Sequence, residues 1–451
     1  MSGEPPRPPD GERALGLEFY LSRTPPVPGR LKARAEEFRV SEISSYPLPD
    51  PEGAFVVLRI ASRDWEQHEL GGAIARRLGL GPHAIQWSGT KDRRAETDRL
   101  LSYRGPLPSG DLGLPRVEVL EAYRARDGLV LGHHYGNAFE IRVSELAVPP
   151  EEARSIFQRA AEELRAAGGF PNLFGLQRFG EVRPITHVVG RCLVQGDLAG
   201  AVDAYLTARP VGGTPGAGDA ARAAYATHRD PVRALAEFPP EYRFERALLE
   251  RLAKGPGPDR ALRALSRDLR LLFVHAFQAL LFNRWVSRRH RAGLPLSAPS
   301  AGDRILRVGR DGTVRSQDAV PVAEDNLPEC RDLVARGRAL VAGPLVGFET
   351  PPGGGPVGEL LAGVLAEEGV TPDMFRLPAA PEVASRGGWR PILLPLPPID
   401  LAPDGDGLWF RFGLPKGAYA TVLLREFLKP GAAGSRAEPF RLTGGDEFSN
   451  T

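Results

Sequence analysis

The stretch NAFEIRVSELAVPPEEARSIFQRAAEELRAAG, residues 137–168, contains the two patterns that decide the fold class. Its first part alternates, with Phe139, Ile141 and Val143 on one face, as expected of a strand with one buried side. Its second part has helical spacing of apolar residues, acidic residues in its first turn and Gly168 at its end. A strand followed by a helix indicates a domain of mixed α and β structure.

The segments before this stretch continue the mixed pattern. Residues 38–43 and 54–61 are rich in β-branched residues and predict two strands, and residues 66–78 predict a helix. The run GLVLGHHYG, residues 128–136, predicts a further strand immediately before the opening stretch. The N-terminal part of the chain is therefore expected to combine a sheet with helices.

The middle and the end of the chain differ from this beginning. Residues 241–292 are dominated by helical periodicity, and the segment ILRVGRDGTVRS that follows predicts a hairpin turning at Asp311-Gly312. Strand character returns in GLWFRFGLP, residues 407–415, and residues 417–428 predict a helix. A mixed beginning, a helical middle and a strand-rich end suggest one domain interrupted by an insertion.

The composition is typical of an intracellular protein with two or three domains. The chain has 451 residues, of which 42% are hydrophobic, and this length exceeds one compact core. Its cations are nearly all arginine, which suits phosphate contacts but is also what a GC-rich genome encodes. Cys192 and Cys330 stand alone, so neither a disulfide framework nor a zinc site is expected. No apolar segment suggests export or a membrane span, and a cytoplasmic location is expected.

One acidic residue lies inside a basic cluster in GTKDRRAET, residues 89–97. Asp92 follows Lys91 and precedes Arg93 and Arg94, and a solvated cluster of ion pairs is one interpretation. The second is that Asp92 reacts and that the cations keep its carboxylate ionised. In an extended chain Arg94 shares the face of Asp92 while the other two cations point away, so Arg94 is the expected partner.

Six stretches together carry a resemblance to a known family. In chain order they are GTKDRRAET, YGNAFEIRV, PNLFGLQRFG, FVHAFQALLFNRW, AGPLVG and FGLPKGAYATVLLRE. Each is weak alone, but their order and spacing are specific. Over roughly residues 30–430 the chain resembles the TruD family of pseudouridine synthases.

The resemblance implies an α+β fold, in which a pseudouridine synthase catalytic domain with a mixed β-sheet is interrupted by a mainly α-helical TRUD domain. The catalytic domain would comprise residues 1–169 and 386–451, and the inserted domain residues 170–385. The implied activity is that of an isomerase converting uridine to pseudouridine in tRNA, typically at position 13, without a cofactor or a metal. The expected partner is tRNA or another structured RNA, with no membrane contact, and a monomer is expected.

The resemblance also assigns site residues. It places the family's catalytic aspartate on Asp92 and its substrate-contacting Asn-x-Phe on Asn137 and Phe139. When a glycosidic bond breaks, a carboxylate can stabilise the charge on the sugar, attack its carbon or remove a ribose proton. Asn137 and Phe139 share one strand face, where they can read and stack on an everted base. A core aromatic is the alternative for Phe139.

Basic side chains are the expected contacts to RNA phosphates. Lys91, Arg93 and Arg94 surround the acid of the motif, and Arg178 in PNLFGLQRFG lies at the start of the insertion. The turn LPKGAYAT can place Lys416 or Tyr419 beside the site, and a helix cap with a packed aromatic is the alternative.

The histidines are expected to be structural. His133 and His134 are adjacent, so on a strand they point to opposite sides, and no acidic or Cys partner lies at ligand spacing. His275 lies in a strongly apolar helix, where a packed histidine is more common than an acid or base.

Two positions depart from the family pattern and bear on the choice of RNA. Arg99 stands where many members carry Gln, two residues beyond Thr97, and SRDWEQ, residues 62–67, lacks a common Thr. Two other functions stay open. One is an RNA-binding or RNA-chaperone protein on the same scaffold without catalysis, and the other is a hydrolase, which requires a second acid such as Glu42 close to Asp92.

Overall fold

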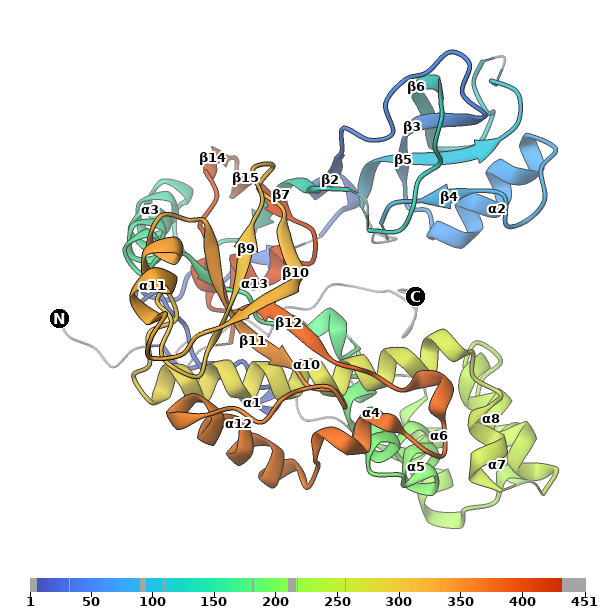
Figure 1. Ribbon diagram of the computed structural model, residues 1–451. Helices are drawn as coiled ribbons and strands as arrows, with labels where there is room; N and C mark the ends of the chain where they lie inside the picture. The colour runs from blue at the N-terminus through green and yellow to red at the C-terminus, as the bar shows by residue number, and fades with distance from the viewer. Residues whose placement is uncertain are drawn as a thin grey trace. The chain divides into compact units, whose positions relative to one another are not determined.

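The computed structural model describes residues 6–431, except residues 32, 90–94, 109, 133, 181, 210–215, 217 and 256. It divides into two compact units (Figure 1). The sheet unit comprises Ser22–Glu163 and Leu396–Thr451, and the helical unit comprises Met1–Leu21 and Leu164–Pro395. The helical unit thus interrupts the sheet unit in the sequence.

The sheet unit is built on a mixed sheet of nine strands. The order is β14-β15-β7-β2-β5-β3-β6, with β1 beside β7 and β4 beside β5. Strands β2 and β5 are parallel, and the other pairs are antiparallel. The elements are β1 Arg30–Leu31, η1 Ala35–Glu37, β2 Phe38–Ile43, β3 Phe55–Arg63, α2 Gln67–Arg77, β4 Gln86–Trp87, β5 Glu96–Arg104, β6 Val117–Ala125, β7 Gly136–Ser144, α3 Pro150–Ala166, β14 Asp400–Asp404, β15 Gly407–Pro415 and α13 Ala420–Leu428.

This sheet confirms the predicted mixed fold, and most predicted elements of the unit lie where the sequence puts them. The strand predicted at residues 128–136 is wrong, because β7 begins only at Gly136. The backbone of the preceding segment bonds elsewhere: Leu129 N donates to Ser102 Oγ at 2.8 Å and Gly132 N to Ser88 O at 2.7 Å. Gly132 has φ +86°, a left-handed conformation that ends any strand pairing at this point.

One face of the sheet, the inner face, carries the core of the unit. Near β3 and β5 it packs on α2, with Leu70 and Ile74 against Ile60 and Leu101. Near β15 the ring of Phe410 lies 5.2 Å from Phe157 of α3 and 5.6 Å from Phe427 of α13. The helices therefore cover the two sides of the inner face, and strands β7, β2 and β5 lie between them.

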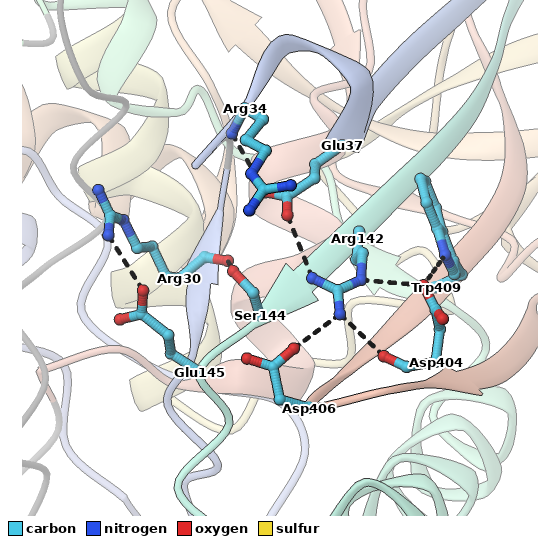
Figure 2. A network of polar contacts seen from close by, with 9 residues as sticks. All are labelled: Arg30, Arg34, Glu37, Arg142, Ser144, Glu145, Asp404, Asp406 and Trp409. Carbon is cyan, nitrogen blue, oxygen red and sulfur yellow. Dashed lines mark hydrogen bonds and ion pairs between the residues drawn. The ribbon is translucent and has the colours of Figure 1, made fainter.

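A polar network on the other face of β7 ties distant segments together (Figure 2). The Arg142 guanidinium contacts Glu37 at 3.1 Å, Asp404 at 3.1 Å and Asp406 at 2.7 Å. Its hydrogen bond lowers the pKa of Asp406. Trp409 Nε1 also donates to Asp404, at 3.0 Å. The network holds η1 and the β14–β15 turn against β7, which keeps the middle of the sheet in register.

The helical unit surrounds the long helix α10, which runs along the length of the unit in Figure 1. A four-stranded sheet of order β10-β9-β11-β12 lies beside it, and its β9–β10 pairing confirms the predicted hairpin. The elements are α1 Asp10–Ala14, β8 Phe170–Pro171, η2 Leu176–Arg178, α4 Thr186–Val194, α5 Leu198–Thr207, α6 Asp219–His228, α7 Pro231–Glu237, α8 Arg243–Ala253, α9 Pro258–Leu262, α10 Arg267–Arg291, β9 Arg304–Val308, β10 Val314–Pro321, α11 Leu327–Ala335, β11 Ala339–Leu345, α12 Gly355–Glu368, η3 Pro372–Arg376, η4 Pro381–Val383, β12 Gly388–Pro391 and β13 Leu393–Leu394.

The N-terminal segment packs with the helical unit and not with the sheet. Asn283 Nδ2 of α10 donates to Leu15 O at 3.0 Å, and Ser287 Oγ donates to Gly16 O at 2.7 Å. The ring of Phe19 stacks on His290 at 4.1 Å. The compact units thus divide at 21/22, 163/164 and 395/396, whereas the sequence places the insertion at residues 170–385. In the described part of the chain, none of the helices combines the length and the apolar character needed to cross a bilayer.

Candidate active site

The motif GTKDRRAET joins β4 to β5 in the sheet unit. The central segment of the motif, residues 90–94, lies outside the described residues. It includes Lys91, Asp92, Arg93 and Arg94. Ser88 and Gly89 lie directly before this segment, and Ala95 and Thr97 directly after it. The contacts of these flanking residues show where the motif leaves the sheet and where it returns.

The leading side of the motif is held by a buried hydrogen-bond cluster. Ser88 is fully buried, and its hydroxyl donates to the carboxylate of Glu42 at the end of β2. Its carbonyl oxygen accepts from Gly132 N at 2.7 Å and lies 2.9 Å from His134 Nδ1. A Cβ at Gly89 would lie only 2.8 Å from the His134 ring, so the close approach requires glycine here.

The trailing side is held just as closely. Ala95 is 1% exposed, and the Thr97 hydroxyl lies 2.9 Å from Ser62 Oγ on the neighbouring strand β3. Arg99 Nη2 donates to the same threonine oxygen at 2.8 Å. Both ends of the motif are therefore fixed by buried polar groups of β2, β3, β5 and the loop before β7.

A row of polar side chains crosses the inner face of the sheet beneath these anchors. Asn137 of β7 pairs directly with Glu42 of β2, and the parallel register of β2 and β5 brings Arg99 level with Glu42. Glu42 is 8% exposed and Arg99 1% exposed. We call Asn137, Glu42 and Arg99 the polar row. Buried polar groups beside the apolar core of a sheet face indicate a functional role.

Two atoms of the polar row, the amide oxygen of Asn137 and Nε of Arg99, are buried without a hydrogen-bond partner among the described residues. Leaving a buried acceptor unsatisfied costs about 1–3 kcal/mol. A buried amide oxygen without a partner, close to the motif, is available to accept a hydrogen bond from a ligand. The expected contact of Asn137 with substrate stays a prediction.

Phe139 lies two positions further along β7 and is 9% exposed. Its ring packs on Phe412 with centroids 5.5 Å apart and meets Phe38 edge-on at 6.3 Å. These contacts fit the core-aromatic alternative for most of the ring. They leave little of the residue for contact with a base.

Arg99 reveals a connection between the two departures from the family pattern. Its Nη1 donates to Gln67 Oε1 at 3.4 Å, so Arg99 contacts the very segment that lacks the common threonine. Its guanidinium lies 5.6 Å from the Trp87 ring centre. Burial lowers the pKa of Arg99 to about 10, against the opposing effect of Glu42. The two expected departures from the family pattern, Arg99 and the stretch of residues 62–67, are therefore in contact.

Arg178 belongs to the helical unit, at the end of η2. Its guanidinium lies 5.5 Å from the Phe174 ring centre, and its Nε is buried without a partner in the described structure. Burial, together with the charge of Arg178, lowers the pKa of His275 to about 4. His275 is therefore neutral at pH 7, in line with a packed histidine. Contact of Arg178 with RNA stays a prediction.

The remaining candidate residues make contacts within the protein. His134 holds Ser88, whereas His133 lies outside the described residues. Lys416 Nζ donates to Gly132 O at 2.6 Å, and Tyr419 is the N-cap of α13. Within the described ranges, no group of three or more His, Cys, Asp or Glu side chains is placed to hold a metal ion.

Sequence reasoning did not identify three of the residues at this site as anchors or neighbours of the motif: Glu42, Ser88 and Gln67. Glu42 entered only as the second acid of a hydrolase. The available signal was its position in FRVSEI, where Phe38, Val40 and Glu42 alternate onto the buried face. An acid at a core position of a strand is unusual and indicates a polar cluster.

Comparison with known proteins extends over this whole architecture. Residues 14–427 match the family model described as tRNA pseudouridine synthase D (TruD). A probable tRNA pseudouridine synthase D of Halobacterium salinarum is 38% identical, covering 93% of this chain and 97% of the relative. That of Pyrococcus abyssi is 35% identical, covering 91% and 98%. The crystal structure of the putative tRNA pseudouridine synthase D from Methanosarcina mazei superposes with a TM-score of 0.80 at 32% identity, covering 93% and 98%.

These matches first define the class: the chain is a pseudouridine synthase, an isomerase. The chain belongs to the tRNA pseudouridine synthase D (TruD) family. The fold, with its mixed sheet and helices, agrees with this membership.

Proposed function

We propose that this protein converts uridine to pseudouridine in tRNA, at position 13, with Asp92 as the catalytic aspartate. Family membership supports the reaction and the substrate class. The main structural support for placing the reaction at this motif is a pair of buried residues, Ser88 and Thr97. Their hydrogen bonds hold both ends of the motif beside the polar row. A reactive side chain needs such a fixed frame to reach its substrate in one geometry.

The reaction requires one ionised carboxylate and no net change in atoms. The C1′–N1 bond of the uridine breaks, the uracil turns, and a C1′–C5 bond forms, while C5 loses a proton and N1 gains one. Asp92 stabilises or bonds the sugar carbon, or removes a ribose proton, during the interval in which the base is detached. Lys91, Arg93 and Arg94 keep the carboxylate ionised and contact phosphates.

Recognition of the base is assigned to the start of β7. A base inside a folded tRNA must be everted before its glycosidic bond is accessible. The amide of Asn137, whose oxygen has no partner in the described structure, is proposed to hydrogen-bond the base edge. Phe139, which is 9% exposed, is proposed to contact the plane of the base. Arg178, which belongs to the helical unit, is proposed to bind a phosphate of the tRNA.

Tritium release tests this proposal. With tRNA labelled at uridine C5, the wild-type protein is expected to release tritium, because C5 exchanges its hydrogen for the sugar carbon. Asp92→Asn is the matched control, with the same shape and no charge; its turnover should vanish while tRNA binding persists. Binding without release would indicate a non-catalytic RNA-binding protein, and liberation of free uracil a hydrolase.

A further inference from the structure

The loop before β7 carries two apolar side chains that point into solvent. Val130 is 54% exposed and Leu131 is 71% exposed, the highest exposure among the large hydrophobic residues of the described structure. We call Val130 and Leu131 the apolar tip. Single exposed leucines are common in proteins, so exposure alone carries no function.

The backbone on both sides of the apolar tip is fixed. On one side Leu129 is 2% exposed, and its N–H donates to Ser102 Oγ of β5 at 2.8 Å. On the other side Gly132 N donates to Ser88 O at 2.7 Å, and Gly132 O accepts from Lys416 Nζ at 2.6 Å. Hydrogen bonds therefore hold the backbone on both sides of two apolar side chains that are exposed to water.

The location of the apolar tip is equally specific. Its anchor Ser88 is the residue that donates to Glu42 and leads into the motif of Asp92. The exposed ammonium of Lys416 lies beside it and is suited to a phosphate. A rigid apolar projection with a cation at its base, directly next to the polar row, fits a nucleic acid in which a base has left its stack.

We propose that Leu131, supported by Val130, is a wedge that enters the base stack of the tRNA when the target uridine is everted. Apolar side chains are inserted between base steps by several classes of nucleic-acid-binding protein, and they offset the lost stacking. The wedge holds the vacated space while the uridine is in the site. This inference rests on the proposed function, since it assumes an everted uridine.

Single-turnover rates of pseudouridine formation on two RNAs test the wedge. One RNA is an ordinary tRNA transcript, and the other has abasic residues on both sides of the target uridine, so that no stack has to be opened. On the ordinary tRNA, Leu131→Ala is expected to be slower than wild type by about tenfold or more. On the abasic RNA the two proteins should react at equal rates, and Leu131→Met should match wild type on both.

A matched control tests whether the effect is specific to Leu131. Leu120→Ala removes an exposed leucine, 47% exposed, from β6 at the far edge of the same sheet, and it should leave both rates unchanged. Equal slowing of Leu131→Ala on both RNAs, or no slowing on either, would overturn the proposal. A change of the protein's sedimentation coefficient in Leu131→Ala would also overturn it, by assigning the apolar tip to contact with a second copy.

A fluorescence experiment keeps the wedge testable even if no pseudouridine is formed. In the Asp92→Asn background, a tRNA with 2-aminopurine next to the target uridine should brighten on binding when Leu131 is present, because the neighbouring base loses its stacking partner. The double variant with Leu131→Ala should bind without brightening. Equal brightening with and without Leu131 would contradict the wedge, whereas a failure of tritium release alone would contradict only the proposed reaction.

Discussion

Glu42 and Arg99 show how single residues shape the site. They lie level on parallel strands, both buried, and each is bonded to a residue that flanks the motif: Glu42 to Ser88 and Arg99 to Thr97. Buried charges are costly unless they are hydrogen-bonded, and here the hydrogen bonds fix the two ends of the segment that contains Asp92.

Removing the Ser88 hydroxyl should slow the reaction without releasing the tRNA. In Ser88→Ala the carboxylate of Glu42 loses this donor, and the motif is free to shift where it leaves the sheet. A displacement of about 1 Å at a catalytic group can reduce the rate about 100-fold. We expect a 10- to 100-fold lower single-turnover rate, roughly, with a Kd for tRNA within about twofold of wild type.

Ser155→Ala is a suitable control, because within the described residues the exposed Ser155 hydroxyl donates to Glu151 O of its own helix α3. A wild-type rate in Ser88→Ala, or a loss of affinity that accounts for the whole effect, would show that the anchor does not position the motif.

Arg99 and Gln67 are expected to behave as a coupled pair. Arg99→Gln introduces the residue expected in many family members, and Gln67→Thr removes the partner of Arg99. Each change alone leaves a buried partner without its hydrogen bond. We expect the double variant to lose less free energy of unfolding than the sum of the losses in the two single variants. The difference, the coupling energy, should be about 0.5–3 kcal/mol. Urea unfolding of the four proteins measures it, and strictly additive effects would mean that the two departures are independent.

At the scale of elements, the loop at residues 128–135 separates what a sequence pattern can predict from what it cannot. Strands β2, β7 and β15 alternate clearly and could be predicted, because one face of each is buried. The loop has a similar apolar content, yet its backbone bonds to Ser88 and Ser102, which are distant in the sequence. Periodicity does not record such tertiary partners.

The same limit applies to the candidate site. Roles for Asp92, Asn137 and Phe139 could be predicted because each lies in a motif that resembles a family pattern. The bond between Ser88 and Glu42 joins residues 46 positions apart, which become neighbours only after β2 and β4 join the same sheet. The burial of Phe139 against Phe412 likewise depends on the pairing of β7 with β15.

Two buried histidines in helices α4 and α10 should make the stability of the helical unit sensitive to acid. Burial lowers the pKa of His187 and of His275 to about 4 from an ordinary value of 6.5, and the charges of Arg284 and Arg178 add to this. The unfolded chain therefore takes up these protons at a higher pH than the folded chain. Stability is fully present above pH 6.5 and declines as the pH falls toward 4, by up to about 3 kcal/mol for each histidine.

Hydrogen exchange of the α10 amides at pH 7 and at pH 4.5 measures this effect. In His187→Gln, which stays neutral, the loss of protection between the two pH values should be smaller than in wild type. An unchanged pH dependence in that variant would show that His187 does not contribute.

At the scale of the whole molecule, the match to relatives extends over both compact units. Its relatives from Halobacterium salinarum and Pyrococcus abyssi are covered over 97% and 98% of their lengths, so both the sheet unit and the helical unit belong to the shared architecture. The N-terminal segment packs on α10 and belongs to the helical unit. Along the sequence, segments of the two units therefore alternate in the order helical, sheet, helical, sheet. Truncating residues 1–21 is therefore a change to the helical unit.

The central claim is that Asp92 makes pseudouridine in tRNA, and mapping pseudouridine in tRNA from living cells tests it most directly. In a host strain whose own gene for this enzyme is deleted, the wild-type chain is expected to restore pseudouridine at position 13. Asp92→Asn, expressed at the same level, should leave that position as uridine. Pseudouridine at position 13 with Asp92→Asn, or unmodified uridine there with the wild-type chain, would contradict the account.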